Sequence, residues 1–285
     1  MRIVSMSGAA AKLVMLRSVL RSPSLPSTLT WRFSCTRGSR LMDLGDIAIA
    51  TITWARSADD ATLLMRSLRC LTRLGVPVVI TDRGTDDSFL RSLQTLPCSI
   101  EIATSGTLVT QVQQSIARAA ALGSRFICYT EPDKETFFHD HLLDFLQRAP
   151  GREDVGAVIA ARSPDSFLTF PPMQQYAERV MNQLCSATFG VDGDYSYGPF
   201  LMHRDLAPAI AKLPQAVGWG WRHATFAAAA RRRRRIVHLV GEYECPHDQR
   251  AEDESDRAHR IRQLSQNLLG LAESMDGGPL SVPSD

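Results

Sequence analysis

The chain has 285 residues, of which 44% are hydrophobic and 22% charged, and its formal net charge at pH 7 is +2. This ordinary globular balance is enough to bury a sizeable core, in one large α/β domain or two small ones. No run of 18 or more apolar residues occurs, which excludes a conventional transmembrane helix.

The N-terminal segment, residues 1–41, is basic, with seven Arg or Lys and no Asp or Glu. Its Ser-rich composition is typical of an organelle transit peptide or of a translated leader ahead of Met42. Arg17 and Arg21 disfavour a secretory signal, because they interrupt or closely follow the apolar patch. We expect this segment to be disordered and the fold to begin near residue 43. The predicted location is cytoplasmic, or an organelle if residues 1–41 are a transit peptide.

The six cysteines are scattered, and none is paired in a C-x-x-C motif or at metal-ligand spacing. Reduced thiols in a cytosol-like compartment are therefore the expected state.

From residue 46 the chain alternates β-branched runs with amphipathic segments. The expected strands are Asp46–Thr53, Val78–Thr81, Ser99–Ala103 and Arg125–Thr130. The expected helices between them are residues 58–74, a segment from Asp86 or Asp87 to about Leu96, and Leu108–Leu122. Short connections in this order predict an α/β fold with a doubly wound, mostly parallel sheet and helices on both faces.

Polar side chains fall at the carboxyl ends of three expected strands. These are Thr53, Asp82 and the pair Glu131 and Asp133. In an open parallel sheet the ligand crevice lies beyond this edge. Alternating carboxylates there offer oxygen ligands to a hard divalent cation, although such a pair also occurs as a simple solvated turn.

Four segments together resemble family 2 glycosyltransferases, which have the GT-A fold. Val79–Ser88 is similar to the second-strand motif, and Gln114–Asp133 to the block that ends in D-x-D. Tyr197–Arg204 and Gly218–Arg222 are similar to the acceptor half. The resemblance covers roughly residues 46–245 and implies a single GT-A-like domain over 43–250, followed by a C-terminal helix and tail over 251–285.

The resemblance implies roles for the strand-end residues. Thr53 and Asp82 would contact the nucleotide, although Asp82 also fits a cap of the turn before Gly84. Lys134 could pair with a phosphate or form a surface ion pair. Asp133 would be the firmer ligand of Mg²⁺ or Mn²⁺, which bridges the two phosphates. Glu131 replaces the usual first aspartate, so it would reach the ribose or the metal differently.

On the acceptor side, Trp219, Trp221 and Arg222 are predicted to bind the acceptor, with one of the two tryptophans as a core anchor. His247 is a candidate third metal ligand by resemblance, and a loop histidine otherwise. An acid from this half would deprotonate the acceptor hydroxyl, and the unranked candidates are Asp192, Asp194 and Asp205. Asp192 and Asp194 also fit ordinary turn chemistry.

Five consecutive arginines, Arg231–Arg235, lie between an expected helix and strand. Because basic residues are favoured at a helix C-terminus, we interpret them as a solvated helix end and predict no nucleic-acid partner.

No motif of a serine hydrolase, P-loop NTPase or dinucleotide oxidoreductase is present. The preferred hypothesis is a metal-assisted glycosyltransferase that uses a nucleotide sugar and an unknown acceptor. Two alternatives remain: a non-catalytic GT-A protein that binds a nucleotide sugar or a partner, and a nucleotidyltransferase. The latter would favour a Gly-rich loop after the first strand, which the segment 53–56 lacks.

Overall fold

The computed structural model describes residues 42–103 and 106–275, and the predicted leader lies outside this part. Its sheet has seven strands in the order β3-β2-β1-β4-β6-β5-β7. The strands are β1 (Ile47–Thr53), β2 (Val78–Asp82), β3 (Ser99–Ile102), β4 (Phe126–Tyr129), β5 (Val155–Arg162), β6 (Phe200–His203) and β7 (Arg235–Gly241). The expected mostly parallel sheet is confirmed, since only β6 runs antiparallel to its neighbours.

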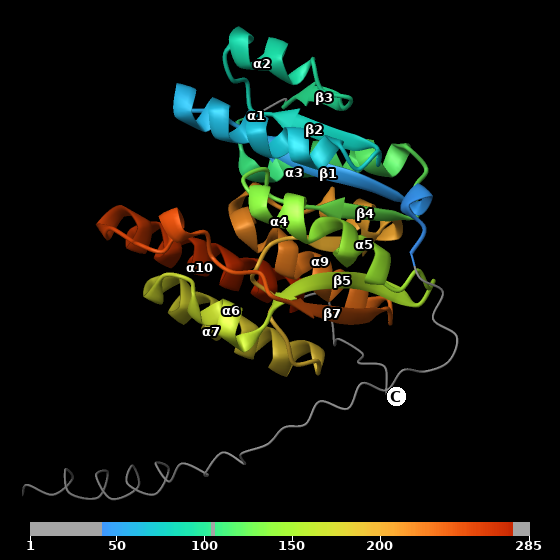
Figure 1. Cartoon of the computed structure of the whole chain (residues 1–285). Helices are drawn as coiled ribbons and strands as arrows, with labels where there is room; N and C mark the ends of the chain where they lie inside the picture. The colour runs from blue at the N-terminus through green and yellow to red at the C-terminus, as the bar shows by residue number, and fades with distance from the viewer. Residues whose placement is uncertain (1–41, 104–105, 276–285) are drawn as a thin grey trace, which may run out of the picture. The chain divides into compact units, whose positions relative to one another are not determined.

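Helices cover both faces of this sheet (Figure 1). The α-helices are α1 (Ala58–Thr72), α2 (Asp87–Leu93), α3 (Leu108–Ala121), α4 (Glu135–Asp140), α5 (Leu142–Arg148), α6 (Pro164–Leu168), α7 (Pro172–Phe189), α8 (Ala207–Ile210), α9 (Trp221–Arg231) and α10 (Glu254–Met275). Short 3-10 turns are η1 (Leu44–Asp46), η2 (Arg204–Leu206), η3 (Gln215–Gly220) and η4 (His247–Gln249). None of the described helices is both long and apolar enough to cross a lipid bilayer.

The core consists of two apolar layers, one on each face of the sheet. In β1, Ile47 and Ile49 belong to the layer that α1, α4 and α5 complete, whereas Ala48, Ala50 and Ile52 belong to the layer under α3, α7 and α9. This division follows from the two-residue period of a strand. Because both faces are buried, the sequence of β1 is continuously apolar or β-branched.

The expected helices are present, and side-chain caps fix their starts. Ser57, Asp86 and Thr107 each accept a hydrogen bond from the backbone N–H three residues ahead, at the N-termini of α1, α2 and α3. The helix from Asp86 ends at Leu93 rather than near Leu96. The last helix extends well beyond the charged stretch that ends at Arg262, because its second half packs against α7, α9 and η3.

The direction of the strands decides which loops share an edge. Parallel pairing of β1, β2 and β4 brings their carboxyl ends together, with Thr53 opposite Asp82 and Ala50 opposite Tyr129. In the antiparallel β6, Phe200 pairs with Tyr129. The segment that enters β6, including Gly198, therefore lies at the same edge as the loop after β4.

The arginine run lies at the opposite edge and forms surface contacts there. Arg234 bonds the Asp205 carboxylate at 2.8 Å, and Arg235 lies 3.9 Å from Asp154. Among the described residues, the five cysteines form no disulfide.

Candidate functional site

The loop after β4 places two carboxylates on one cavity. Glu131 is largely buried, and its Oε1 accepts a hydrogen bond from Arg222 Nη1 at 2.8 Å. Its Oε2 is buried and has no hydrogen-bond partner in the described structure. Asp133 is exposed to the cavity and forms no hydrogen bond or ion pair within the described residues. The site thus holds one carboxylate that an ion pair fixes, Glu131, and one that has no partner in the described structure, Asp133.

Gly198 creates the space that Glu131 occupies. Its φ of +131° lies in a region that residues with a side chain rarely adopt. A Cβ at this position would lie only 2.3 Å from Glu131 Oε2. The carboxylate of Glu131 therefore packs directly against the backbone of the chain that enters β6.

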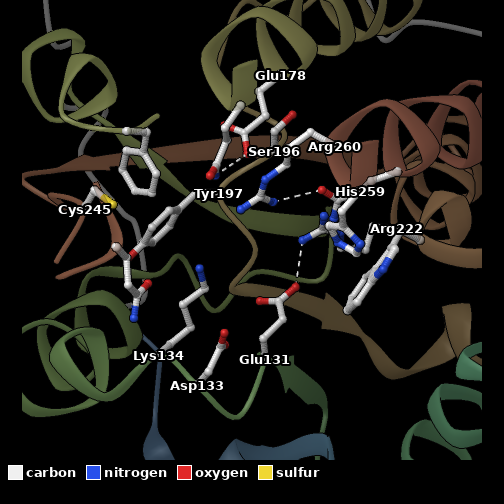
Figure 2. Close-up of a pocket in the computed structure, with 15 residues that line it drawn as sticks. Glu131, Asp133, Lys134, Glu178, Ser196, Tyr197, Arg222, Cys245, His259 and Arg260 are labelled. Carbon is white, nitrogen blue, oxygen red and sulfur yellow. Dashed lines mark hydrogen bonds and ion pairs between the residues drawn. The ribbon is translucent and has the colours of Figure 1, made fainter. Parts of the chain in front are cut away.

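The cavity between these segments has a volume of about 240 Å³. Figure 2 shows Glu131, Asp133 and Lys134 on one side, and Glu178, Ser196 and Arg260 on the other. The polar and charged side chains of the lining come from the β4 loop, α7, the segment before β6, α9 and α10. The full lining is Glu131, Asp133, Lys134, Phe170, Gln174, Glu178, Ser196, Tyr197, Trp219, Arg222, Cys245, Gln249, His259, Arg260 and Gln263.

A buried ion-pair network supports the α7 side of the cavity. The Arg162 guanidinium bonds Asp194 Oδ2 at 2.6 Å and Glu178 Oε2 at 2.6 Å. Asp194 also accepts from Asn182 and from the Ser196 backbone N–H. Burial alone raises the pKa of Asp194, but the charge and hydrogen bonds of Arg162 outweigh it and hold that pKa below its ordinary value. This network fixes Glu178 and Ser196 on the cavity wall.

Tyr197 extends the cavity wall towards the β4 loop. Its ring stacks on Tyr243 at a centroid distance of 5.2 Å, and Lys134 Nζ lies 5.0 Å from its centroid. Burial raises the pKa of Tyr197, so the phenol is neutral at physiological pH. Lys134 is therefore held over an aromatic face and forms no ion pair with a described carboxylate.

Helix α10 closes the cavity through a contact between two glycines. A Cβ on Gly270 would lie 2.2 Å from the Gly220 carbonyl oxygen, and a Cβ on Gly220 would meet the Gln266 carbonyl at 2.1 Å. Gln266 Oε1 also accepts from the Trp219 backbone N–H at 3.1 Å. Only glycine at these positions permits the backbones to pack so closely, and this packing fixes the helix that carries His259, Arg260 and Gln263.

Asp82, predicted to bind the nucleotide, is instead fully buried and saturated with hydrogen bonds. Its Oδ1 accepts from the backbone N–H groups of Gly84 and Thr85, and its Oδ2 from the hydroxyls of Thr53 and Thr85. Both side chains hold the turn after β2, which agrees with the turn-capping alternative for Asp82, and a nucleotide contact of Asp82 or Thr53 stays a prediction.

Trp54, which the sequence did not single out, offers an aromatic surface to a ligand at the carboxyl edge of the sheet. Trp54, directly after β1, is 46% exposed, and the Arg83 guanidinium lies 4.1 Å from its ring centroid. Arg56 approaches the same ring at 5.8 Å. A tryptophan directly after the first expected strand was the signal that the sequence offered.

The three candidate bases do not line the cavity. Asp194 is buried against Arg162, and Asp192 is exposed outside the lining. Asp205 follows the antiparallel strand β6, so it lies at the edge opposite Glu131 and pairs with Arg234. The carboxylates that do line the cavity are Glu131, Asp133 and Glu178.

Of the three acceptor-side candidates, two line the cavity and one lies in the core. Trp219 and Arg222 line the cavity. Trp221 is fully buried and packs edge-on against Tyr129 at 4.6 Å, so it is the core anchor of the pair and cannot touch a ligand here. His247 is exposed and does not line the cavity.

The carboxylates of Glu131 and Asp133 can supply part of the ligand set of a divalent cation. Carboxylate oxygens suit Mg²⁺ and Mn²⁺, and Mg²⁺ commonly takes one or two protein carboxylates and completes its shell with phosphates and water. Asp133 and the unpartnered Oε2 of Glu131 supply such oxygens. Within the described residues no three His, Cys, Asp or Glu side chains cluster as a complete site. The predicted third ligand, His247, does not contribute.

No protein-family model matches the sequence, and no curated protein matches it. Solved structures do match. The mannosyltransferase PcManGT from Pyrobaculum calidifontis, in complex with GDP-Man and Mn²⁺, has a TM-score of 0.57 and 16% identity. That match covers 83% of this chain and 66% of the mannosyltransferase, slightly less than two thirds of its length.

A second similar structure is glucosyl-3-phosphoglycerate synthase from Mycobacterium tuberculosis. In complex with Mn²⁺, UDP and glucosyl-3-phosphoglycerate it has a TM-score of 0.56 and 12% identity, over 84% of this chain and 81% of the synthase. The same synthase with Mg²⁺ and UDP has a TM-score of 0.53. The chain therefore has the GT-A fold of nucleotide-diphospho-sugar transferases, as expected.

Proposed function

We propose that the protein is a glycosyltransferase that moves a sugar from a nucleoside-diphosphate sugar to an acceptor hydroxyl, assisted by Mg²⁺ or Mn²⁺. The observation that carries this proposal is the position of Glu131 and Asp133. Both follow β4 at the carboxyl edge of a GT-A sheet and line one cavity. Ligands of open α/β sheets bind at this edge. Structures with the same fold hold GDP-Man or UDP together with Mn²⁺.

In this proposal the nucleobase lies against Trp54. The indole is exposed at the end of β1, and Arg83 at 4.1 Å limits its movement. An aromatic face accepts any base by stacking, so this contact supplies affinity without choosing the nucleotide. Asp82 acts indirectly, because its four hydrogen bonds fix the turn that carries Arg83.

The diphosphate lies near the β4 loop. Asp133, with Glu131 Oε2, would hold the cation, which neutralises the charge that develops on the departing nucleoside diphosphate. Lys134 adds a positive charge on the same loop that no described carboxylate neutralises. Arg222 would be the positioning residue, since it holds Glu131 Oε1 and so orients Oε2.

The geometry favours transfer over simple hydrolysis of the donor. Polar side chains that can bind hydroxyl groups, namely Gln174, Ser196 and Gln263, line the cavity. Figure 2 shows Ser196 on the side away from the β4 loop. An acceptor bound there would face the donor sugar across the cavity.

Calorimetric titration of the full chain with UDP, GDP, UDP-glucose and GDP-mannose, each with and without Mn²⁺, tests this proposal. We expect one nucleotide series to bind, and to bind more tightly with Mn²⁺. If none of the four ligands binds, the proposal is wrong. If a nucleotide sugar binds but is never consumed with any hydroxyl acceptor offered, the non-catalytic alternative is favoured.

A further inference from the structure

The cavity contains an arginine that has no acidic partner among the residues that the structure describes. Arg260 of α10 donates from Nη1 to the neutral Gln263 Oε1 at 3.0 Å and forms no ion pair with a carboxylate in the described structure. The other cavity arginine, Arg222, is paired with Glu131, and the supporting Arg162 is paired twice. Arg260 is therefore the guanidinium of the cavity lining that is left available for an anion.

The position of Arg260 separates it from the proposed cation site. Figure 2 shows Asp133 and Lys134 reaching into the cavity from the β4 loop, and Arg260 reaching in from the other side beside Ser196 and Glu178. The glycine contact between η3 and α10 holds that helix close to the body of the domain. Arg260 therefore lies on a wall of the cavity whose helix is fixed by packing.

The other groups near Arg260 suit an acidic ligand that also has hydroxyl groups. Gln263 offers hydrogen-bond donors, and the Ser196 hydroxyl, which donates to Asn182 Oδ1, can accept a hydrogen bond from a ligand hydroxyl. His259 adjoins Arg260 on the same wall. Desolvation, and then the charges of Arg260 and Arg262, lower the pKa of His259, so its ring is neutral at pH 7 and donates without adding charge. The acid on this side of the cavity lining, Glu178, is already bonded by Arg162 and Gln174.

We propose that the acceptor is a small molecule bearing a phosphate or carboxylate group, and that Arg260 binds this group on the α10 wall. The inference rests on the proposed function and names its acceptor class. A guanidinium matches both anions because its fork of N–H donors bonds two oxygens at once. The cavity volume of about 240 Å³ lies below the usual range of ligand pockets, which favours a small acceptor over a large one.

Glycerol 3-phosphate, glycerate and glycerol form a matched series of probes, with a phosphate, a carboxylate and no charge. Each is titrated into the full chain, first alone and then with the tightest-binding nucleotide diphosphate and Mn²⁺ present. The variants are Arg260→Gln and, as the matched control, Arg262→Gln, which is exposed on the same helix and lies outside the cavity lining.

We expect at least one acidic probe to bind at least tenfold more tightly than glycerol. The ratio of the glycerol 3-phosphate and glycerate affinities shows which anion the site prefers. Arg260→Gln should weaken the acidic probes at least tenfold and leave the nucleotide affinity within about twofold, whereas Arg262→Gln should change neither.

The inference is overturned if glycerol binds as well as the acids, if no probe binds, or if Arg260→Gln leaves the acidic probes unaffected. It is also overturned if Arg260→Gln weakens the nucleotide diphosphate instead, because Arg260 would then serve the donor. Failure of the proposed function is distinguishable, since nucleotides then fail to bind in the wild type. If nucleotides do not bind but an acidic probe still binds and depends on Arg260, the anion site is supported and only the proposed function fails.

Discussion

Arg222 and Glu131 are 91 residues apart in the chain, and their side chains meet at 2.8 Å beside the cavity. This ion pair joins α9 to the carboxyl end of β4 and orients the Glu131 carboxylate, so that Oε1 is used and Oε2 is left without a partner. An unpartnered buried oxygen is costly unless a ligand or ion satisfies it. The pair therefore prepares Glu131 to meet a cation rather than to move a proton.

Gly198→Ala should displace Glu131. The new methyl would overlap Oε2, and the φ of +131° would strain any residue with a Cβ. We expect a loss of about 1–3 kcal/mol in the free energy of unfolding from backbone strain, together with weaker Mn²⁺-dependent nucleotide binding. Chemical denaturation and calorimetry measure the two effects. Gly45→Ala is the control, because a Cβ there meets only an ordinary contact at 3.5 Å. Unchanged nucleotide binding in Gly198→Ala would show that Glu131 has no part in the site.

Trp54→Ala should weaken nucleotide binding by roughly tenfold or more, since base stacking on an aromatic ring contributes about 1–3 kcal/mol. Trp54→Phe should retain part of the affinity. Tyr176→Ala serves as the control, because Tyr176 is also an exposed aromatic residue but lies on α7 outside the cavity lining. Equal affinities of the Trp54→Ala variant and the wild type, measured by calorimetry, would place the base elsewhere.

Arg162→Leu should destabilise the fold in a pH-dependent way. In the wild type the pKa of Asp194 lies below 3.8, so this pair stabilises the fold above about pH 4, and its contribution is lost as the pH falls through the lowered pKa. Without Arg162, desolvation raises the pKa of the same buried carboxyl. The cost of burying an unpaired carboxylate then applies only above that raised pKa, where the group ionises. We expect a loss of about 3–5 kcal/mol at pH 7 and a smaller loss near pH 4.

Urea denaturation at both pH values measures this difference. Arg179→Leu is the control, because Arg179 is exposed and forms no ion pair in the described structure. A loss that is equal at pH 7 and pH 4 would mean that Asp194 does not need Arg162 to remain ionised.

The sequence predicted the first half of the fold well because its signals are local. Continuous apolar strands such as Ile47–Thr53, helix caps such as Ser57, and the strand–helix alternation need no knowledge of distant contacts. The antiparallel direction of β6 was not predictable in this way. It depends on pairing between Phe200 and Tyr129, which are remote in sequence. For that reason the sequence could not show that Asp205 lies at the edge opposite Glu131.

The candidate site shows the same limit. Glu131, Asp133 and Lys134 were found because a strand end places them together. For Asp82 the sequence left two roles open, because a carboxylate that holds a turn and one that binds a ligand have the same local sequence. The structure shows its four hydrogen bonds within the turn. Arg260 could not be singled out within a charged helix, since its role depends on the fold of α10 against η3.

The central claim is that Asp133 holds a divalent cation beside a nucleotide diphosphate. Its most direct test is calorimetric titration of UDP and GDP, with and without Mn²⁺, into the wild type, Asp133→Asn and the control Asp165→Asn, whose exposed carboxylate lies outside the cavity lining. We predict that Mn²⁺ strengthens binding of one nucleotide to the wild type and to Asp165→Asn, and that Asp133→Asn loses this gain by at least tenfold. Nucleotide binding that is indifferent to Mn²⁺ and to Asp133→Asn, or no binding at all, would contradict the claim.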